Sequence, residues 1–430
     1  MHLRNLQPSL PFFIKSLDQV DPAISRSVRS EEGRQQDQIE LIAPKNYLSV
    51  ASRQAVASMM AFTSVEGYPG RRYHAGVGNI DEIERIAIAR ARAMFNAGHA
   101  NVQPHSGTQA NQAIYFALLQ LGDTVLSMEL SAGGHLSHGQ KSNLSGKWFK
   151  TVFYRTDTAG LIDYEDMQEQ ALQHRPKLII VGGSSYPRTI EFEKVASIAK
   201  SVGAKVLADV AHFSGLIVGG QYSHPFPHVD IITTTTNKNL RGPRGGLILS
   251  RDADLGKLID SAVFPGIQGG PLPEMITAKA VCFGEALDSE FSEYARHVLA
   301  NARTIAAGLQ KRGYEIVTGG TDTPLVMIDL RAKRVTGDIA QEALEAAGLT
   351  CNRNLVPYDP EKPNITSGLR IGTSAITTRG MKTEEADIIA GLLSDVLDKV
   401  VSGARGADAS TPETLIAVKE LSRSFPIYPH

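Results

Sequence analysis

One lysine of this sequence stands where a cofactor with an aldehyde group could be held covalently. Lys238 lies in TTTTNKNLRGPRGG (residues 233–246), after a β-branched apolar run and before a loop rich in glycine and arginine. Lysine is the side chain that forms a Schiff base with a carbonyl cofactor, and α/β folds bind ligands at the carboxyl ends of their strands. A surface lysine in a turn would show the same sequence pattern, so other segments must distinguish the two interpretations.

A second segment suits the same kind of site. In VLADVAHFSG, Asp209 ends an apolar run and His212 follows three residues later. A carboxylate there could keep a pyridinium nitrogen protonated, and the histidine could reach the ring face or its phenolic oxygen. An aspartate after a strand is also often only a helix cap.

Two further segments offer a phosphate site and a flat ring. Ser106, Gly107 and Thr108 stand at a predicted helix start in VQPHSGTQANQA, where free backbone amides can bind a phosphate. A plain capped helix explains these three residues as well. His135 lies beside a glycine pair in ELSAGGHLSHG, where its imidazole could stack on a ring or serve only as a turn residue.

The elements that would position these residues alternate between strand and helix from about residue 80 to 270. Apolar residues at helical spacing predict helices over 81–97 and 193–204. Short apolar runs predict strands, which lie at 123–127, 177–183, 205–212, 230–236 and 245–250. Strands that alternate with helices imply a mostly parallel sheet covered on both faces.

The pattern changes after Pro271. A helix from about 272 to 300 is predicted as a hinge, and the strand-like segments 323–331 and 369–377 with a last helix near 384–400 predict a smaller α+β domain. We expect three parts along the chain: an N-terminal arm (1–45) that packs on another subunit or on the small domain, a large cofactor-binding domain (46–272), and the hinge helix with a small C-terminal domain (273–430).

Composition narrows the class of protein. The 44 Lys and Arg balance 45 Asp and Glu, so no global field would draw the chain onto nucleic acid or a membrane, and any phosphate must be captured by a local site. Cys282 and Cys351 are the only cysteines, which argues against disulfides and a cysteine-built zinc site and favours a cytoplasmic protein; no metal site is predicted. Pro8 and Pro11 interrupt the N-terminus, which lacks the apolar core of a signal peptide.

Taken together and in this order, the segments resemble the serine hydroxymethyltransferases, a family of fold type I pyridoxal-phosphate enzymes. The resemblance covers nearly the whole chain, and it also runs through QIELIAPKNY (38–47), EGYPGRRYHAG (66–76), SAVFPGIQGGPL (261–272) and SGLRIGTSAITTRG (367–380). It implies an aspartate-aminotransferase-like α/β fold with a large domain on a mostly parallel mixed sheet and a smaller α+β domain. It also implies pyridoxal 5'-phosphate as cofactor, tetrahydrofolate as co-substrate, and a homodimer or homotetramer.

The resemblance assigns roles residue by residue. Lys238 would form the Schiff base, Asp209 would pair with the pyridine nitrogen, and His135 would stack on the ring. The cofactor phosphate would be bound by Ser106, Gly107 and Thr108 and, across a dimer interface, by Gly269 and Gly270. Ser184 and His212 would approach the ring oxygen, and Arg244 would support the lysine loop. The folate pocket would be lined by Leu130, Gly134, Leu136, Phe264 and Asn354.

Three residues would act on the substrate. Glu66 matches the family's acid/base carboxylate, which must move a proton during cleavage or folate transfer, and Tyr73 matches a nearby tyrosine. A purely structural Glu66, bonded to a backbone amide, is the alternative. Arg370 would clamp the substrate carboxylate with a bidentate fork.

The sequence departs from the family pattern around the predicted amino-acid site. Pro44, Lys45 and Asn46 stand where the family reads Ser-Glu-Asn, and the other changes replace tyrosine by Ser64, tyrosine by His74 and histidine by Asn237. The folate-lining positions are retained. The smaller His74 and Ser64 should free volume that an extra α-methyl group could fill. We therefore favour α-methylserine giving alanine as the reaction over serine giving glycine. Modest reshaping is enough for this change, because a pocket discriminates over one methyl by only about 1–3 kcal/mol.

Two other classes of function stay open. One is a folate-independent β-hydroxy amino acid aldolase or transaldolase on the same scaffold, which a requirement for tetrahydrofolate would exclude. The other is a non-enzymatic member that binds cofactor or a partner, which the retained Lys238, Asp209, Arg370 and Glu66 argue against.

Overall fold

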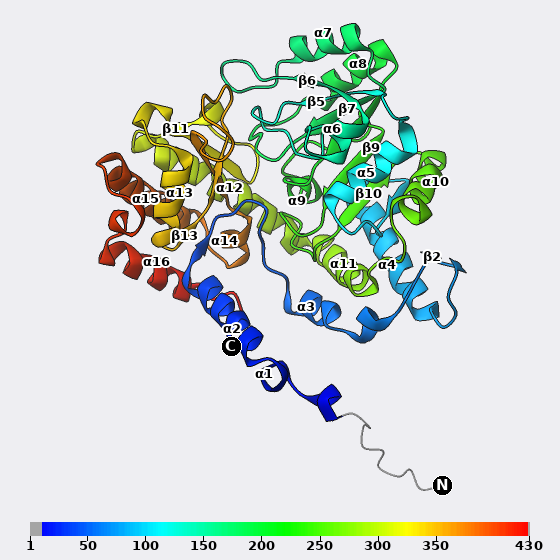
Figure 1. Cartoon of the computed structure of the whole chain (residues 1–430), viewed down its shortest axis with the longest axis horizontal. Helices are drawn as coiled ribbons and strands as arrows, with labels where there is room; N and C mark the ends of the chain where they lie inside the picture. The colour runs from blue at the N-terminus through cyan, green and yellow to red at the C-terminus, as the bar shows by residue number, and fades with distance from the viewer. Residues whose placement is uncertain (1–10, 429–430) are drawn as a thin grey trace.

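A seven-stranded sheet forms the centre of the larger lobe in the computed structural model, which describes residues 11–428 (Figure 1). Its strand order is β4-β10-β9-β8-β7-β5-β6. The strands are β4 His99–Asn101, β5 Thr124–Met128, β6 Lys150–Tyr154, β7 Leu178–Gly182, β8 Lys205–Asp209, β9 Ile231–Thr235 and β10 Gly246–Ser250. The run from β6 to β9 pairs in parallel, whereas β10 pairs antiparallel with β9 and β4. The predicted mostly parallel mixed sheet is therefore present.

Successive side chains of each strand enter two separate cores. On β7, Leu178 and Ile180 pack into one core, and Ile179 and Val181 pack into the other. Helices cover both faces, which explains why the strands read as continuous apolar runs. The helices of this lobe are α4 Gly78–Phe95, α5 Gly107–Leu118, α6 Leu144–Trp148, α7 Tyr164–His174, α8 Phe192–Val202, α9 Ser214–Val218, α10 Ala253–Ser261 with the π-helical turn Ala262–Ile267, and α11 Pro273–Ala286.

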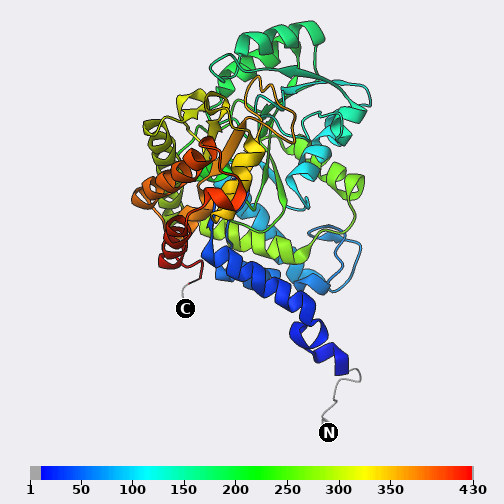
Figure 2. The ribbon, with the colours of Figure 1, turned by 60° about the vertical axis from the view of Figure 1, so that its left-hand side comes forward.

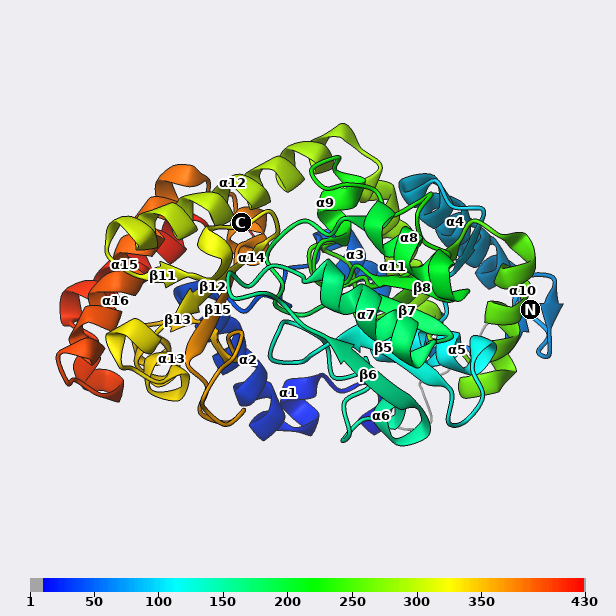
Figure 3. The ribbon, with the colours of Figure 1, turned by 90° about the horizontal axis from the view of Figure 1, so that it is seen from above.

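The smaller lobe is built on a four-stranded antiparallel sheet with its own core (Figure 3). Its strand order is β11-β12-β15-β14. The elements are β11 Glu315–Ile316, β12 Leu325–Asp329, α13 Gly337–Ala346, β13 Leu349–Thr350, β14 Asn352–Asn354, β15 Gly368–Gly372, α14 Ser374–Thr378, α15 Thr383–Val401 and α16 Pro412–Ser424. The predicted last helix near 384–400 corresponds to α15.

The predicted single hinge helix over 272–300 is wrong. The chain forms α11 and then a second helix, α12 Ser289–Lys311, with a break between them. Asp288 caps α12 by accepting a hydrogen bond from the Glu290 amide, and a capped start ends the preceding helix because the cap residue is not helical. Residues 291–299 of α12 pack in the larger lobe's core and 302–309 in the smaller lobe's core, so α12 is the helix that joins the lobes (Figure 3).

The N-terminal arm leaves the body of the molecule (Figure 2). Its helices are α1 Leu17–Val20 and α2 Pro22–Asp37, and it ends in β1 Ile39–Glu40, which pairs with β13. Ile39 and Leu41 lie in the smaller lobe's core, so the predicted packing on the small domain is confirmed for this part of the arm. Residues 1–10, including Pro8, lie outside the described residues, and the exact division of the chain at 45 and 272 stays a prediction.

A short stretch links the arm to α4. It contains α3 Val50–Val56, the 3-10 turn Met59–Phe62, and a hairpin of β2 Gly67–Tyr68 and β3 Arg71–Arg72. Within residues 11–428, no helix combines the length and apolar composition that a membrane span requires. Both cysteines are buried and unpaired.

Candidate active site

The carboxyl ends of β8 and β9 open into a cavity of about 370 Å³ that Lys238 lines. Asp209 is the last residue of β8, and Lys238 follows β9 by three residues. The side chains and backbone around the cavity come from several loops: Ile42, Pro44, Lys45, His105, Ser106, Gly107, Thr108, His135, Gly183, Ala211, His212, Thr235, Asn237, Arg244 and Gly245. The four segments singled out in the sequence therefore meet at one site.

Lys238 and His212 are in direct contact. The Nζ atom of Lys238 lies 2.9 Å from Nε2 of His212. Burial, followed by the charge of Lys238 and Arg370, holds the pKa of His212 well below its usual range, so its ring is neutral and Nε2 can accept the bond. Burial also lowers the pKa of Lys238 to about 8; Asp209 opposes that shift, while Arg370 and Arg244 add to it.

A low pKa at Lys238 leads to a testable pH dependence. Only the neutral amine attacks an aldehyde, so the cofactor-free enzyme should capture pyridoxal phosphate covalently about tenfold faster per pH unit up to about pH 8 and then level off. Absorbance after rapid mixing measures this rate, and the same titration with a small lysine amide corrects for the cofactor's own pH dependence. A rate that keeps rising toward pH 10.5, the value of an ordinary lysine, would contradict the assignment.

Asp209 is held ionised by a buried network. Its Oδ2 atom accepts hydrogen bonds from His138 Nε2 and Asn111 Nδ2, both at 2.9 Å, and Oδ1 accepts one from the Ala211 amide. Asn111 in turn accepts a bond from the Thr233 hydroxyl at 2.6 Å. Burial acts to raise the pKa of Asp209, but these bonds and the neighbouring histidines outweigh it and leave the pKa well below its usual range. A permanent carboxylate at this depth suits a protonated ring nitrogen.

Sequence reasoning missed His138 and Asn111. Both lie in segments that it quoted, His138 three residues after His135 and Asn111 four residues after Gly107. The second spacing is one helical turn on α5, which places Asn111 on the same helix face as Gly107. Nothing in the spacing alone could tell that both side chains point at Asp209.

His135 presents a neutral ring to the cavity. Its Nδ1 atom lies 2.8 Å from the Ser137 hydroxyl, which fixes the ring, and burial lowers its pKa to about 4, with His138 acting in the same direction. A neutral, fixed imidazole on the cavity wall is suited to stacking on a flat ring, as expected from the sequence.

The opposite end of the cavity is formed by the start of α5. Ser106 is the N-cap, and its hydroxyl accepts the Gln109 amide at 3.2 Å, so a part of the predicted phosphate site also serves as a cap. The first amides of a helix, here those of Gly107 and Thr108, have no intrahelical acceptor. A Cβ at Gly107 would lie 2.5 Å from Thr235 Cγ2, so only glycine allows this close approach. The Thr235 hydroxyl is buried and unpaired among the described residues.

These groups fit pyridoxal phosphate chemically. The cavity offers an amine of lowered pKa at Lys238, a buried carboxylate at Asp209, a flat neutral ring at His135 and free helix-start amides with an adjacent guanidinium at Arg244. They correspond to the cofactor's aldehyde, ring nitrogen, ring face and phosphate.

Arg370 approaches this site from the smaller lobe. It lies on β15, its Nε donates to Asn352 Oδ1 at 3.0 Å, and Nη1 donates to the Ser184 carbonyl at 2.6 Å. Burial lowers the pKa of Arg370 to about 10, so the side chain stays charged at neutral pH. Two fixed contacts set the plane of the guanidinium, and Nη2 has no acceptor among residues 11–428. That edge is available to a carboxylate.

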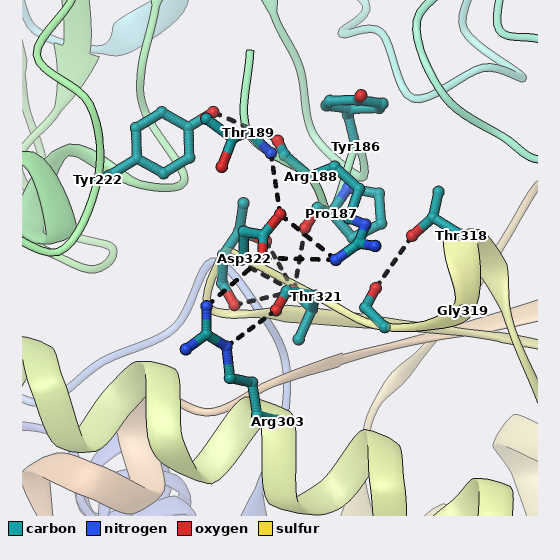
Figure 4. Close-up of polar contacts among 12 residues, drawn as sticks. Tyr186, Pro187, Arg188, Thr189, Tyr222, Arg303, Thr318, Gly319, Thr321 and Asp322 are labelled. Atoms are coloured by element: carbon teal, nitrogen blue, oxygen red, sulfur yellow. Dashed lines mark hydrogen bonds and ion pairs between the residues drawn. The ribbon is translucent and has the colours of Figure 1, made fainter. Parts of the chain in front are cut away.

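The segment 184–189 ties the smaller lobe to the site (Figure 4). Besides the Ser184 contact with Arg370, the Pro187 carbonyl accepts the Asp322 amide at 2.8 Å, and the Asp322 carboxylate lies between Arg188 and Arg303, 3.4 Å from each. These contacts lie just before β12, the neighbour of β15. This segment therefore helps to position Arg370 relative to Lys238, together with α12 and the Asn239–Ser374 hydrogen bond.

The other predicted cofactor and folate residues of this region do not line the cavity itself. The Ser184 hydroxyl donates to the Gly134 carbonyl at 2.7 Å, and Asn354 donates to Ser185 Oγ at 3.2 Å. Leu130, Gly134 and Leu136 lie on the loop that carries His135, and Leu136 is 51% exposed. The contact of Ser184 with the ring oxygen and the folate-lining roles stay predictions.

A second group of predicted residues lies outside this cavity. We call it the Glu66 patch, and it comprises Ser64, Glu66, Tyr73, His74, Phe264, Gly269 and Gly270. Tyr73 is 76% exposed and packs edge-on against Phe264 at 5.7 Å, and a Cβ at Gly269 would lie 3.7 Å from Glu66 Oε1. The Glu66 carboxylate forms no hydrogen bond within the described chain, so the backbone-bonded alternative is not observed.

The Glu66 patch rests on a buried ion cluster. Arg72, beside Tyr73, contacts Asp81 and Glu84, and Gln103 donates to Glu84 Oε1 at 2.8 Å. The hairpin that carries these residues is therefore fixed even though Tyr73 and His74 face outward.

Two of the departures from the family pattern meet beside Lys238. Pro44 and Asn237 both line the cavity, and the Asn237 amide lies 3.5 Å from the Pro44 carbonyl. Lys45, another departure from the family pattern, pairs with Glu40 at 2.9 Å. Asn46 donates to the Lys238 carbonyl at 2.9 Å and so helps to hold the lysine loop. Ser64 and His74, in contrast, lie on the Glu66 patch.

Comparison with known proteins agrees with this arrangement. The family profile described as serine hydroxymethyltransferase matches residues 17–393. The serine hydroxymethyltransferase of Paramagnetospirillum magneticum is 52% identical over 422 residues, which is 98% of this chain and 99% of that protein. Those of Rhodospirillum centenum and Acidiphilium cryptum are 52% and 50% identical, over 99% and 97% of this chain and 99% and 97% of their own lengths.

Proposed function

Because this chain belongs to the serine hydroxymethyltransferase family, we propose that it is a hydroxymethyltransferase whose preferred amino acid is α-methylserine, which it converts to alanine. Enzymes of this family use pyridoxal phosphate, with tetrahydrofolate as the co-substrate that accepts the one-carbon unit. Serine giving glycine is the second candidate, and the names of the relatives favour it.

Residues of the cavity, Arg370 and Glu66 would each have a separate role in the reaction. When bound, pyridoxal phosphate supplies an electron sink for the bond broken at Cα. Lys238 would hold it, Asp209 would keep its ring nitrogen protonated and His135 would cover one face. Arg370 would bind the substrate carboxylate through the free edge of its guanidinium and so fix which bond at Cα faces the ring. Glu66 would move the proton.

The wall beside Lys238 is the observation that favours an α-methyl substrate. Ile42 and Pro44 line it with apolar surface, and Asn237 stands where the family has the larger histidine. A proline in place of serine removes a hydroxyl that could bind the amino acid, and a buried methyl group gains about 0.8 kcal/mol from apolar contact. That is enough to change preference between substrates that differ by one methyl.

Restoring the family's tyrosine at position 74 tests the proposed preference. We expect His74→Tyr to lower kcat/KM for α-methylserine relative to serine by about 10-fold, or about 1.4 kcal/mol, because the Glu66 patch would complete the partner's cavity and return the tyrosine bulk to the side where the methyl group must fit. Steady-state rates with each amino acid and saturating tetrahydrofolate measure the ratio.

A second variant places the same test inside the cavity. Asn237→His, alone and with Pro44→Ser, should move the ratio in the same direction, whereas His297→Tyr on α12 should leave it unchanged. If all variants and the wild type share one ratio that favours serine, serine is the substrate and the departures do not determine preference.

We further propose that the functional unit is at least a homodimer. The Glu66 patch carries the predicted cross-subunit residues and lies outside the cavity of its own protomer. The arm also exposes apolar side chains at helical spacing: Leu17, Val20, Ile24 and Val28. Both features support a partner subunit that completes the site and covers the arm.

A further inference from the structure

Lys279 on α11 is a buried charge with no role in the proposed reaction. Its side chain is 1% exposed, and its ammonium donates to the carbonyls of Val102, Pro104 and Gly246 at 2.6, 3.1 and 2.9 Å. These bonds use all three donors of a lysine ammonium. Lysine is almost never fully buried unless it is paired, so the burial of this ammonium needs a physical explanation.

The three carbonyls belong to two segments that line the active-site cavity. Val102 and Pro104 lead directly into Ser106 at the start of α5, and Gly246 begins β10 after the lysine loop. The Gly246 amide also donates to the Pro104 carbonyl at 2.8 Å. The ammonium therefore joins the helix-start loop to the return of the lysine loop.

Gly245 separates Lys279 from the cavity. This glycine lines the cavity, and a Cβ on it would lie 2.2 Å from Lys279 Cε and 2.6 Å from Nζ. The site thus accommodates the ammonium directly behind the cavity wall, at the end where Ser106, Gly107 and Arg244 lie.

Within residues 11–428, no direct ion pair neutralises the charge of Lys279. Glu84 is a charged group that opposes the lowering of the Lys279 pKa, and its carboxylate is itself bound by Arg72 and Gln103. An unneutralised buried charge is costly, and an anion on the other side of Gly245 would offset that cost. Burial lowers the pKa of Lys279 to about 7, in keeping with a charge that lacks a carboxylate partner.

We propose that Lys279 is a positioning residue for the cofactor phosphate: it holds the 102–106 loop against Gly245 and Gly246 and places a positive charge behind the phosphate site. It acts through these backbone groups and does not touch the phosphate. The inference rests on the proposed function only in that Ser106, Gly107 and Thr108 bind the phosphate.

Comparing two forms of the cofactor tests this role without measuring turnover. The cofactor-free Lys279→Met variant should bind pyridoxal phosphate about 10- to 100-fold more weakly than wild type, a range typical of residues that orient binding groups from behind. Pyridoxal, which lacks the phosphate, should bind within about 2-fold of wild type. Inorganic phosphate should raise the melting temperature of the cofactor-free wild type but not of the variant.

The matched control is Cys282→Ala, a change on the same helix that removes a contact with the Leu240 carbonyl and should leave the ratio of the two affinities unchanged. If Lys279→Met does not fold, Gly245→Ala displaces the ammonium and should give the same phosphate-selective loss. Equal weakening of both ligands, or none, would overturn the proposal. A wild type that binds pyridoxal as well as pyridoxal phosphate would instead refute the phosphate site itself.

Discussion

Replacing Lys238 with alanine is expected to abolish covalent attachment of the cofactor and to lower hydroxymethyl transfer by more than about 10³-fold. Lys238 is a partly buried amine of the cavity, its pKa is lowered to about 8, and His212 holds it at 2.9 Å. Borohydride reduction followed by intact mass measurement should show one reduced cofactor on the wild-type chain and none on the variant.

A second lysine of the cavity, Lys45, serves as the control for this prediction. Lys45 also lines the cavity, but it pairs with Glu40 at 2.9 Å and is nearly half exposed. Lys45→Ala should therefore keep the reduced adduct. Peptide mapping that placed the cofactor on Lys45, or on any residue other than Lys238, would sink the assignment.

The second large effect is expected at Glu66. Glu66→Gln preserves size and hydrogen bonding but removes the proton-transfer capacity, so folate-dependent transfer should fall roughly 10²- to 10⁴-fold while cofactor affinity is kept. The carboxylate has no hydrogen-bond partner within residues 11–428 and is therefore free to act. Glu82→Gln, a change of an exposed glutamate on α4, is the matched control, and a wild-type rate in Glu66→Gln would leave Glu66 without a catalytic role.

Mixing two inactive variants can reveal on which subunit Glu66 acts. If the Glu66 patch completes the partner's cavity, a hybrid of Lys238→Ala and Glu66→Gln subunits has one site with both residues intact. Activity should then reappear when the purified variants are dissociated and reassembled together. Mixtures that stay inactive, although mass measurement shows hybrid dimers, would place Glu66 in the same chain's site.

The sheet could be predicted because its strands are buried on both faces. A strand packed on two sides must be apolar at every position, so runs such as KLIIVGG indicated β7, and the residues that follow β8 and β9 marked the active-site edge. The break between α11 and α12 was not predictable from apolar spacing, because the periodicity continues through it. A single cap at Asp288 decides it.

The polar network behind the cofactor could not be predicted for a different reason. His138, Asn111 and Lys279 act through contacts with residues far along the chain, and each contact depends on how strands and helices pack. Buried polar side chains look like ordinary polar residues in a sequence, since burial is a property of the fold. The residues of the Glu66 patch were predicted only through the family resemblance. That the patch lies outside the cavity could be learned only from the structure.

Direct competition between two amino acids tests the proposed substrate preference. Purified enzyme loaded with pyridoxal phosphate is given equal concentrations of L-serine and α-methylserine, the latter as each enantiomer in turn, with and without tetrahydrofolate. Mass spectrometry then quantifies the glycine and alanine released. We expect that alanine exceeds glycine and that both depend on tetrahydrofolate. Glycine as the main product, with both enantiomers of α-methylserine untouched, would contradict it.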